Sequence, residues 1–157
     1  MSRDATTTMA KARQLCTFSI DGMRFGVDVM NVQEVIRYQQ MTRVPLAAAT
    51  VRGLINLRGQ IVTAIDVRAR LGLEPRSDDA LPMNVVATTA DGVVSLLVDE
   101  IGDVVEVDER AFERTPETMS ALFKELVRGV FKLDEGLVLL LDAERVGALG
   151  AAACGRE

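Results

Sequence analysis

The segment Arg52-Gly53-Leu54-Ile55-Asn56-Leu57 returns 76 residues later as Arg128-Gly129-Val130-Phe131-Lys132-Leu133. The strand that follows each segment also corresponds without a gap, with Ile61, Val62, Ala64, Ile65 and Asp66 matching Leu137, Val138, Leu140, Leu141 and Asp142. Chance similarity between apolar strands is the simpler alternative, but the shared Arg-Gly and Asp positions favour a duplication. The sequence therefore predicts two copies of one β-rich unit.

A turn signal stands upstream of the repeated segment in both copies. Asp21-Gly22 lies between apolar runs in the first copy, and Asp91-Gly92 lies between apolar runs in the second, at an offset of 70. Gly accepts the positive φ of a tight hairpin turn, so Asp-Gly between β-branched runs predicts a hairpin. Each copy should contain a hairpin, a short connection and a second hairpin that begins at Arg-Gly.

The pattern of apolar residues predicts mostly strands and a few short helices. The expected strands are Leu15–Ile20, Met23–Val29, Thr50–Leu57, Gln60–Asp66, Met83–Thr89, Val93–Val98, Gly129–Leu133 and Gly136–Leu141. Ile61–Ile65 and Leu137–Leu141 are continuously apolar, which indicates burial on both faces. The expected helical segments are Val29–Ile36, Val67–Leu71 after an Asp66 N-cap, and Glu117–Val127.

The chain should form one domain over residues 15–147. The first copy spans about residues 18–73 and the second about 83–147, and the polar, Pro-flanked segment 74–82 is the expected linker between them. Residues 1–14 and 148–157 are expected to be flexible ends.

The composition argues against most catalytic chemistry. The 157 residues include no His and no Trp, and Tyr38 is the only Tyr. Without an imidazole, Ser-His and Cys-His nucleophilic sites, the usual general base and most catalytic zinc sites are excluded. Cys16 and Cys154 lie near opposite ends and form no CxxC motif, so we expect no structural metal, no disulfide scaffold and no cofactor, and a reducing compartment.

The charge is divided unevenly along the chain. Residues 1–80 carry a net charge of +3 and residues 81–157 a net charge of -8, which together give -5. Such a division can orient a protein between two different neighbours, although drift of surface charge would give the same count. An acidic chain with 4% aromatic residues is a poor nucleic-acid binder. The N-terminal segment lacks a secretory signal, and no apolar run is long enough to insert into a membrane.

The two copies differ at the tip of the repeated hairpin. The first copy has Asn56-Leu57-Arg58-Gly59 where the second has Lys132-Leu133-Asp134-Glu135. A turn needs only Gly, Asn or Asp, so the scaffold does not require Arg58. A cation fixed beside a turn glycine could recognise a carboxylate or a carbonyl group, whereas a solvated surface Arg is the plainer interpretation.

These residues resemble the chemotaxis coupling protein family, CheW. The likeness covers roughly residues 15–147, and its more specific elements are Val32-Gln33-Glu34-Val35 and Asn56-Leu57-Arg58-Gly59. Arg52-Gly53 and Ile65-Asp66-Val67-Arg68 also match. Val98-Asp99, Gly129 and Leu141-Asp142 extend it. Thr63-Ala64 departs from the family, which commonly has Pro before a β-branched residue there.

The resemblance implies two intertwined, five-stranded, SH3-like β-barrels, and it leaves open which barrel the first strand completes. It also implies a non-catalytic adaptor that joins chemoreceptor tips to the regulatory module of the histidine kinase CheA. Such an adaptor would be cytoplasmic and reach membrane-bound receptor arrays through its partners. By the same match, partner contact is expected at Val32, Glu34, Val35 and Arg58, while Gly53, Asn56 and Gly59 are expected to shape turns.

Two other functions are kept as alternatives. Asp66 and Asp142, one from each copy, could act as a paired-carboxylate hydrolase, although both begin short helical patterns and are explained as N-caps. A small β-barrel that binds a ligand or a nucleic acid is the second alternative.

Overall fold

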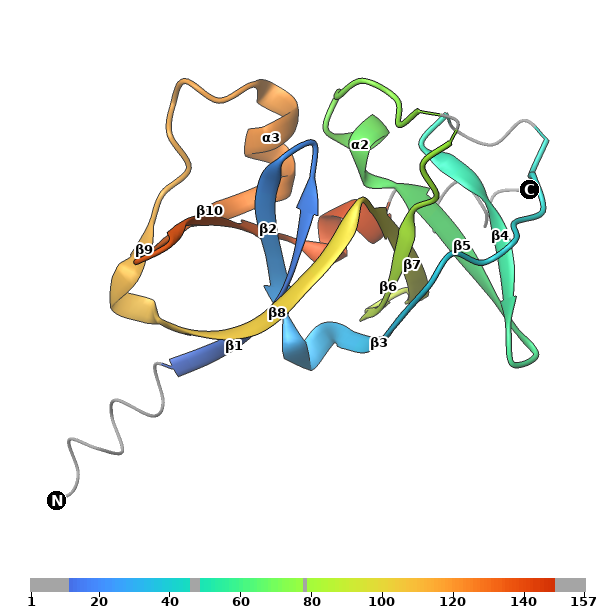
Figure 1. The fold of residues 1–157 in the computed structure, drawn as a ribbon, viewed down its shortest axis with the longest axis horizontal. Coiled ribbons are helices and arrows are strands. Elements are labelled where there is room, and N and C mark those ends of the chain that lie inside the picture. The colour runs from blue at the N-terminus through green and yellow to red at the C-terminus, as the bar shows by residue number, and fades with distance from the viewer. Residues whose placement is uncertain (1–11, 46–48, 78, 149–157) are drawn as a thin grey trace, which may run out of the picture.

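The computed structural model describes residues 12–45, 49–77 and 79–148 (Figure 1). Its elements in chain order are β1 (Ala12–Ile20), β2 (Met23–Asp28), η1 (Val29–Asn31), β3 (Val32–Ile36), β4 (Val51–Leu57), β5 (Gln60–Asp66), α2 (Val67–Arg70), β6 (Met83–Thr89), β7 (Gly92–Val98), β8 (Glu100–Asp108), η2 (Glu109–Ala111), β9 (Phe112–Glu113), α3 (Ala121–Leu126), β10 (Val127–Leu133) and β11 (Gly136–Leu141). Residues 143–148 are also helical.

The strands of the described residues form two sheets, each curled into a small barrel. The six-stranded barrel has the order β8-β1-β2-β11-β10-β9, and the five-stranded barrel has the order β3-β6-β7-β5-β4. The two barrels lie side by side in Figure 1. The predicted fold class, mainly β with two intertwined SH3-like barrels and short helices, is confirmed, with the two-residue strand β9 added to one barrel.

The barrels exchange strands between the two copies of the repeat. Strand β5 of the first copy pairs in parallel with β7 of the second, where Ala64 lies opposite Ser95. Strand β11 of the second copy pairs in parallel with β2 of the first, where Leu140 lies opposite Gly26. Each barrel therefore contains strands of both copies, and β1 belongs to the barrel that holds β8 to β11.

The segment 74–82 lies between the two copies of the repeat in the chain, but it does not join the two barrels. It connects α2, which follows β5, to β6, and β5 and β6 both belong to the five-stranded barrel. The chain passes between barrels elsewhere, at η1 and at Asp99, because β2 and β8 belong to one sheet while β3 and β7 belong to the other. The boundary between the two copies of the repeat therefore does not coincide with the boundaries between the two barrels.

The flexible ends expected at residues 1–14 and 148–157 fall largely outside the described residues. Where the structure does describe them, it differs, because residues 12–14 already belong to β1 and residue 148 belongs to the last helical segment. The domain therefore extends slightly beyond residues 15–147 at both ends.

All eight predicted strands are present, and the repeated hairpins agree in register. In β4–β5, Val51 pairs with Ile65 and a bulge follows before Gly53. In β10–β11, Val127 pairs with Leu141 and a bulge follows before Gly129. The bulge lies at the same position of both copies, so the duplication includes this irregularity of the backbone.

The predicted helix over Val29–Ile36 is wrong, because only Val29–Asn31 form a 3-10 turn and the rest is strand β3. A bulge at Gln33 explains the misleading pattern. Val32 lies opposite Ala87 and Val35 opposite Val85, so two valines three residues apart share one face of a strand. That spacing imitates the period of a helix.

The helix expected over Glu117–Val127 is shorter than predicted, because α3 covers only Ala121–Leu126. The hydroxyl oxygen of Ser120 accepts a hydrogen bond from the Phe123 N–H and caps the helix there. Val127 then begins strand β10.

Strand β8 was not predicted. It carries the sequence Glu-Ile-Gly-Asp-Val-Val-Glu-Val-Asp, whose acidic residues are poor strand formers. A bulge also interrupts its pairing with β1, where Gly102 passes so close to Thr17 that a Cβ would lie 2.6 Å from the Thr17 hydroxyl oxygen. The alternation of apolar and polar residues is broken at that point.

Three apolar clusters hold the described part of the chain together. The largest lies between the barrels and contains Phe18 and Phe25 of one sheet with Val85 and Leu96 of the other. A second cluster around Phe131 fills the six-stranded barrel, and a third around Ile55 fills the five-stranded barrel. The core between the barrels fixes their relative position, and the surfaces beside it are therefore well defined.

Candidate functional site

Glu34 and Arg58, two residues expected at a partner surface, form an ion pair with two hydrogen bonds. Arg58 Nη1 and Nη2 donate to the two carboxylate oxygens of Glu34, each at 2.6 Å. Glu34 comes from β3 and Arg58 from the tip of the β4–β5 hairpin, and these strands stand at the two ends of the five-stranded order. The pair therefore spans the gap between the first and last strands of that sheet.

The turn itself holds Arg58 in an unusual backbone conformation. Arg58 has a φ of 54° and Gly59 a φ of 87°, as a type I′ hairpin turn requires. The side-chain oxygen of Asn56 accepts a hydrogen bond from the Gly59 N–H at 2.9 Å. Asn56 and Gly59 thus shape the turn that directs Arg58 toward β3.

The electrostatics of the pair are those of an exposed contact. The hydrogen bond from Arg58 lowers the pKa of Glu34, and the same contact raises the pKa of Arg58. The Arg58 side chain is 69% exposed and that of Glu34 is 20% exposed. Because water screens such pairs, this one should contribute little to the stability of the fold. Both charges remain accessible to another molecule.

Val32 and Val35 occupy the opposite face of β3 from Glu34. Both are partly buried and pack against the core between the barrels. The four expected contact residues therefore form two groups: an ion pair that bridges the two edge strands of the five-stranded sheet, and two valines that pack against the core between the barrels.

Gly53 is placed within β4 and not in a turn. A Cβ on Gly53 would lie 2.6 Å from the Thr42 carbonyl oxygen. Thr42 and Leu54 exchange two backbone hydrogen bonds of 2.8 Å at this point. Gly53 is thus required for the close approach of the chain before β4 to the strand.

Asp66 and Asp142 have the N-cap contacts that the sequence predicts. Asp66 Oδ1 accepts from the N–H groups of Arg68 and Ala69, and its other oxygen lies 3.2 Å from Arg52 Nη1. Asp142 Oδ1 accepts from the N–H groups of Glu144 and Arg145, and Arg128 lies 4.0 Å away. Both carboxylates cap the following helical segment, but Asp142 also lies 3.6 Å from Arg145 Nε, which is closer than Arg128, whereas the ion pair of Asp66 is with Arg52.

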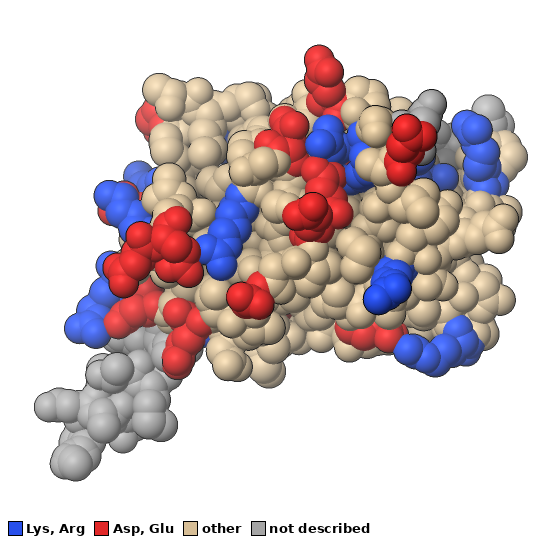
Figure 2. All heavy atoms as spheres, in the orientation of Figure 1, with Lys and Arg blue, Asp and Glu red and all other residues tan. Residues whose placement is uncertain are grey.

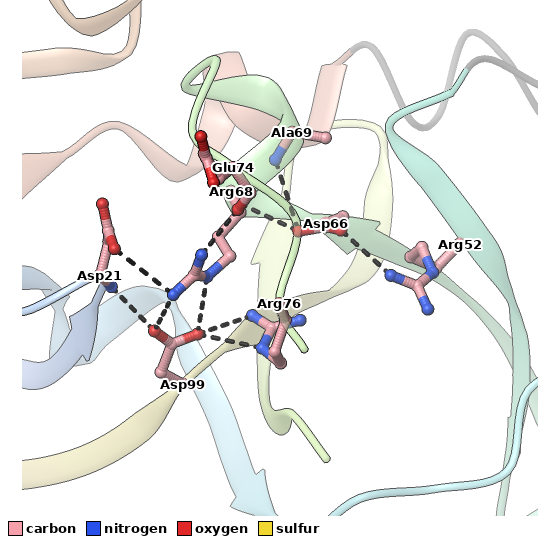
Figure 3. A network of polar contacts seen from close by, with 8 residues as sticks. All are labelled: Asp21, Arg52, Asp66, Arg68, Ala69, Glu74, Arg76 and Asp99. Atoms are coloured by element: carbon pink, nitrogen blue, oxygen red, sulfur yellow. Dashed lines mark hydrogen bonds and ion pairs between the residues drawn. The ribbon is translucent and has the colours of Figure 1, made fainter. Parts of the chain in front are cut away.

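A network around Asp99 was not predicted (Figure 3). The Asp99 carboxylate accepts hydrogen bonds from Arg68 Nε and Nη2, from Arg76 Nε and Nη2, and from the Asp21 N–H. It thereby joins the β1–β2 turn, α2 and the segment after α2. Asp99 and Arg68 stood within matched motifs, but the sequence gave no signal that Arg76 would meet them.

This network has a strong effect on the ionisation of Asp99. Partial burial opposes its charge, but the hydrogen bonds from Arg68, Asp21 and Arg76 prevail and lower its pKa to about 2. The Arg68 and Arg76 side chains are only 13% and 6% exposed. The contacts are therefore better protected from solvent than the Glu34–Arg58 pair.

Charge is distributed unevenly over the folded barrels. Residues 29–98, which include the five-stranded barrel, carry a net charge of +1, whereas residues 12–28 and 99–148 carry -7. In Figure 2 acidic side chains gather at the left and centre, over the six-stranded barrel. The net negative charge is therefore concentrated in one barrel, just as it is concentrated in one half of the sequence.

No group of three or more Cys, Asp or Glu side chains is placed to hold a metal ion within residues 12–45, 49–77 and 79–148. Within the same ranges, no helix is long and apolar enough to cross a membrane.

Comparison with known proteins agrees with this architecture. The model of the CheW-like domain matches residues 14–149. A probable chemotaxis protein CheW of Rhizobium etli is 35% identical over 84% of this chain and 85% of its own, and the chemotaxis protein CheW of Rhizobium meliloti is 32% identical over 85% and 86%. The crystal structure of the scaffolding protein TtCheW from Thermoanaerobacter tengcongensis superimposes with a TM-score of 0.76 at 25% identity, covering 84% of this chain and 90% of that one. The chain belongs to the CheW-like domain family.

Proposed function

We propose that this chain is a non-catalytic chemotaxis scaffold that couples methyl-accepting chemoreceptors to the histidine kinase CheA. It acts in the cytoplasm and reaches receptor arrays through these partners. Its membership of a family whose relatives are chemotaxis and scaffolding proteins supports this function. The observation that carries the proposal furthest is the exposed Glu34–Arg58 pair, because it joins two of the residues at which the family resemblance leads us to expect partner contact.

The pair offers a partner both a charge and a fixed geometry. The guanidinium of Arg58 is held at one orientation by Glu34 and by the strained turn beneath it. Because Arg58 is already held in one orientation, binding to it costs less conformational entropy than binding to a mobile side chain. Charges at such a rim mainly determine register and partner choice.

Apolar side chains near the seam supply the complementary contact. Val32 and Val35 are partly buried beside the seam, and Met30 in η1 is 88% exposed. Val104 is 56% exposed and lies opposite Cys16, which in turn lies opposite Val27. This pairing places Val104 on the same face of the sheet as Cys16 and Val27, but its side chain is exposed and does not belong to the core between the barrels. A helical receptor tip could lay apolar residues against this region.

The alternative functions have no comparable support. Asp66 and Asp142 belong to different barrels, and each is engaged by backbone N–H groups and an arginine. Their contacts are those of helix caps, and no observation brings the two carboxylates to one substrate. The acidic six-stranded barrel is equally unsuited to a nucleic acid.

Capture of the chain by the kinase regulatory module and by a receptor cytoplasmic fragment tests the proposal. We expect the wild type to bind both and Arg58→Glu to bind at least one about tenfold more weakly, because the substitution replaces a cation by a charge that repels Glu34. The control is Arg110→Glu, which disrupts another exposed ion pair, with Asp108. Absence of binding by the wild type would remove the proposed function, whereas full binding by Arg58→Glu would remove only Arg58 from the surface. Glu34→Lys tests the neighbouring charge in the same assay.

A further inference from the structure

A cavity of about 180 Å³ lies on the five-stranded barrel, between the segment that follows α2 and the chain between β3 and β4. Its walls combine two cations with apolar side chains, and the residues that matter here are Tyr38, Met41, Arg52, Arg76, Leu81 and Pro82. Arg52 stands near the start of β4, whereas Arg58 stands just beyond its end. At a rise of about 3.3 Å per residue the two arginines are separated by roughly 20 Å, so this cavity is a different place from the Glu34–Arg58 pair.

Both arginines of the cavity are held in place by carboxylates at their backs. Arg76 Nε and Nη2 donate to one oxygen of Asp99 at 3.0 and 2.9 Å, and the Arg76 side chain is only 6% exposed. Arg52 Nη1 donates to Asp66 at 3.2 Å, and the Asp66 side chain is only 7% exposed. Figure 3 shows both contacts as the two ends of one network. The cations are therefore positioned before any ligand arrives.

Arg52 still has hydrogen-bond donors to offer. Its side chain is 47% exposed, and among the described residues its only side-chain acceptor is Asp66, through Nη1. The Nε and Nη2 groups remain for another acceptor. A guanidinium presents its donors as a planar fork that matches the two oxygens of a carboxylate.

The other side chains that line the cavity favour a ligand in which an apolar group adjoins the carboxylate that binds Arg52. Leu81 is 62% exposed and Tyr38 is 36% exposed, while Met41 is partly buried in the interior of the barrel. The barrel region from residue 29 to 98 is also slightly positive, in contrast to the acidic remainder of the described chain. A negatively charged side chain with an adjoining aliphatic residue is the chemical group that meets all of these features.

We propose that this cavity binds an acidic side chain of a partner protein, with the carboxylate on Arg52 and an adjacent aliphatic residue against Leu81. The protein that supplies this acidic side chain need not be the receptor or the kinase of the proposed function. Its test is therefore separate from that of the proposed function, and either can fail alone.

The test is a titration of the ¹⁵N-labelled full chain, followed by NMR at the arginine Nε–H and backbone N–H signals. The probe is acetyl-Leu-Glu-amide, its uncharged match is acetyl-Leu-Gln-amide, and inorganic phosphate is the third arm. We expect saturable shifts at Arg52 and Tyr38 with the Glu probe, and about tenfold weaker binding of the Gln probe because it lacks the charge. No saturation with the Glu probe, or equal binding of the Gln probe, overturns the proposal. Phosphate bound as tightly as the Glu probe also overturns it, since the site would then recognise any anion.

The duplication supplies a matched control for the variants. Arg52→Gln should abolish saturation, whereas Arg128→Gln alters the equivalent Arg–Asp pair of the second copy and should leave binding unchanged. Leu81→Glu leaves the Asp66 contact intact and places a carboxylate beside the cavity, so it should weaken probe binding about tenfold by competing for Arg52. Unchanged binding in Arg52→Gln or in Leu81→Glu would contradict the assignment.

Discussion

The two repeated hairpins, β4–β5 and β10–β11, are alike at the base and different at the tip. At the base, each has an arginine beside an aspartate that caps the next helical segment, and each has its bulge at the same step. At the tip, Arg58 reaches across to Glu34, whereas Glu135 lies 3.6 Å from Arg24. The arginine–aspartate pair and the bulge, which both hairpins share, are features that the fold requires. The ion pairs at the tips differ, and the fold leaves them free to vary.

The largest effect should come from the paired core positions Ile55 and Phe131, which are 1% and 0% exposed. Phe131→Ala should lower the free energy of unfolding by about 3–5 kcal/mol and Ile55→Ala by about 2–4 kcal/mol, since the aromatic ring leaves the larger cavity. Urea denaturation of both variants measures the difference. A greater loss for Ile55→Ala would show that the five-stranded barrel carries more of the stability than its side chains suggest.

Next in size is Asp99, which has no counterpart in the repeated hairpins. Asp99→Asn should lower the free energy of unfolding at neutral pH by about 2–3 kcal/mol, because Arg68 and Arg76 lose their charged acceptor. The pKa of Asp99 is lowered to about 2 from 3.8, so its stabilisation is complete above about pH 5 and is lost as the pH falls toward 2. The groups that face it are Arg68, Arg76 and Asp21.

Unfolding measured from pH 5 to pH 2 checks this dependence. The wild type should lose stability over that range more steeply than Asp99→Asn, and Asp91→Asn, on an exposed turn, is the control. Parallel curves for wild type and Asp99→Asn would mean that the network does not stabilise the native state.

A smaller effect is expected at the bases of the hairpins. Asp66→Ala should cost about 2 kcal/mol and Asp142→Ala about 1 kcal/mol, because Asp66 is more buried and closer to its arginine. Thermal melts of the two variants under one condition give the comparison. Equal losses of stability would indicate that both residues act only as helix N-caps.

The smallest effect on stability belongs to the tips. Arg58→Glu and Glu135→Lys each break an exposed ion pair and should leave the thermal midpoint nearly unchanged. A large drop for Arg58→Glu would mean that the pair closes the barrel and would weaken the case for partner contact.

The sequence predicted the repeated parts of this fold well because each signal was local. The Asp-Gly turns, the Arg-Gly hairpins and the Asp66 and Asp142 caps depend on residues that are near one another in the chain. It failed where a bulge changed the period, as at Gln33 and Gly102, since one extra residue moves every later side chain to the other face.

The site was predictable only in part for a related reason. The motifs marked Glu34 and Arg58 separately, but their contact spans 24 positions of the chain and depends on how the sheet curls. Arg76 lies in a segment that reads as a loose linker, yet Asp99 holds its side chain almost completely buried. Such long-range pairing leaves no periodic trace in a sequence.

The exchange of strands between the copies has a consequence for synthesis on the ribosome. Strand β2 pairs with β11, which is more than a hundred residues further along the chain, so the six-stranded barrel cannot close until translation is almost complete. The five-stranded barrel needs nothing beyond β7 and can form earlier. We expect β1 and β2 to emerge first from the ribosome and to remain longest without their partner strands. Their apolar faces are therefore the part of the nascent chain most in need of a chaperone.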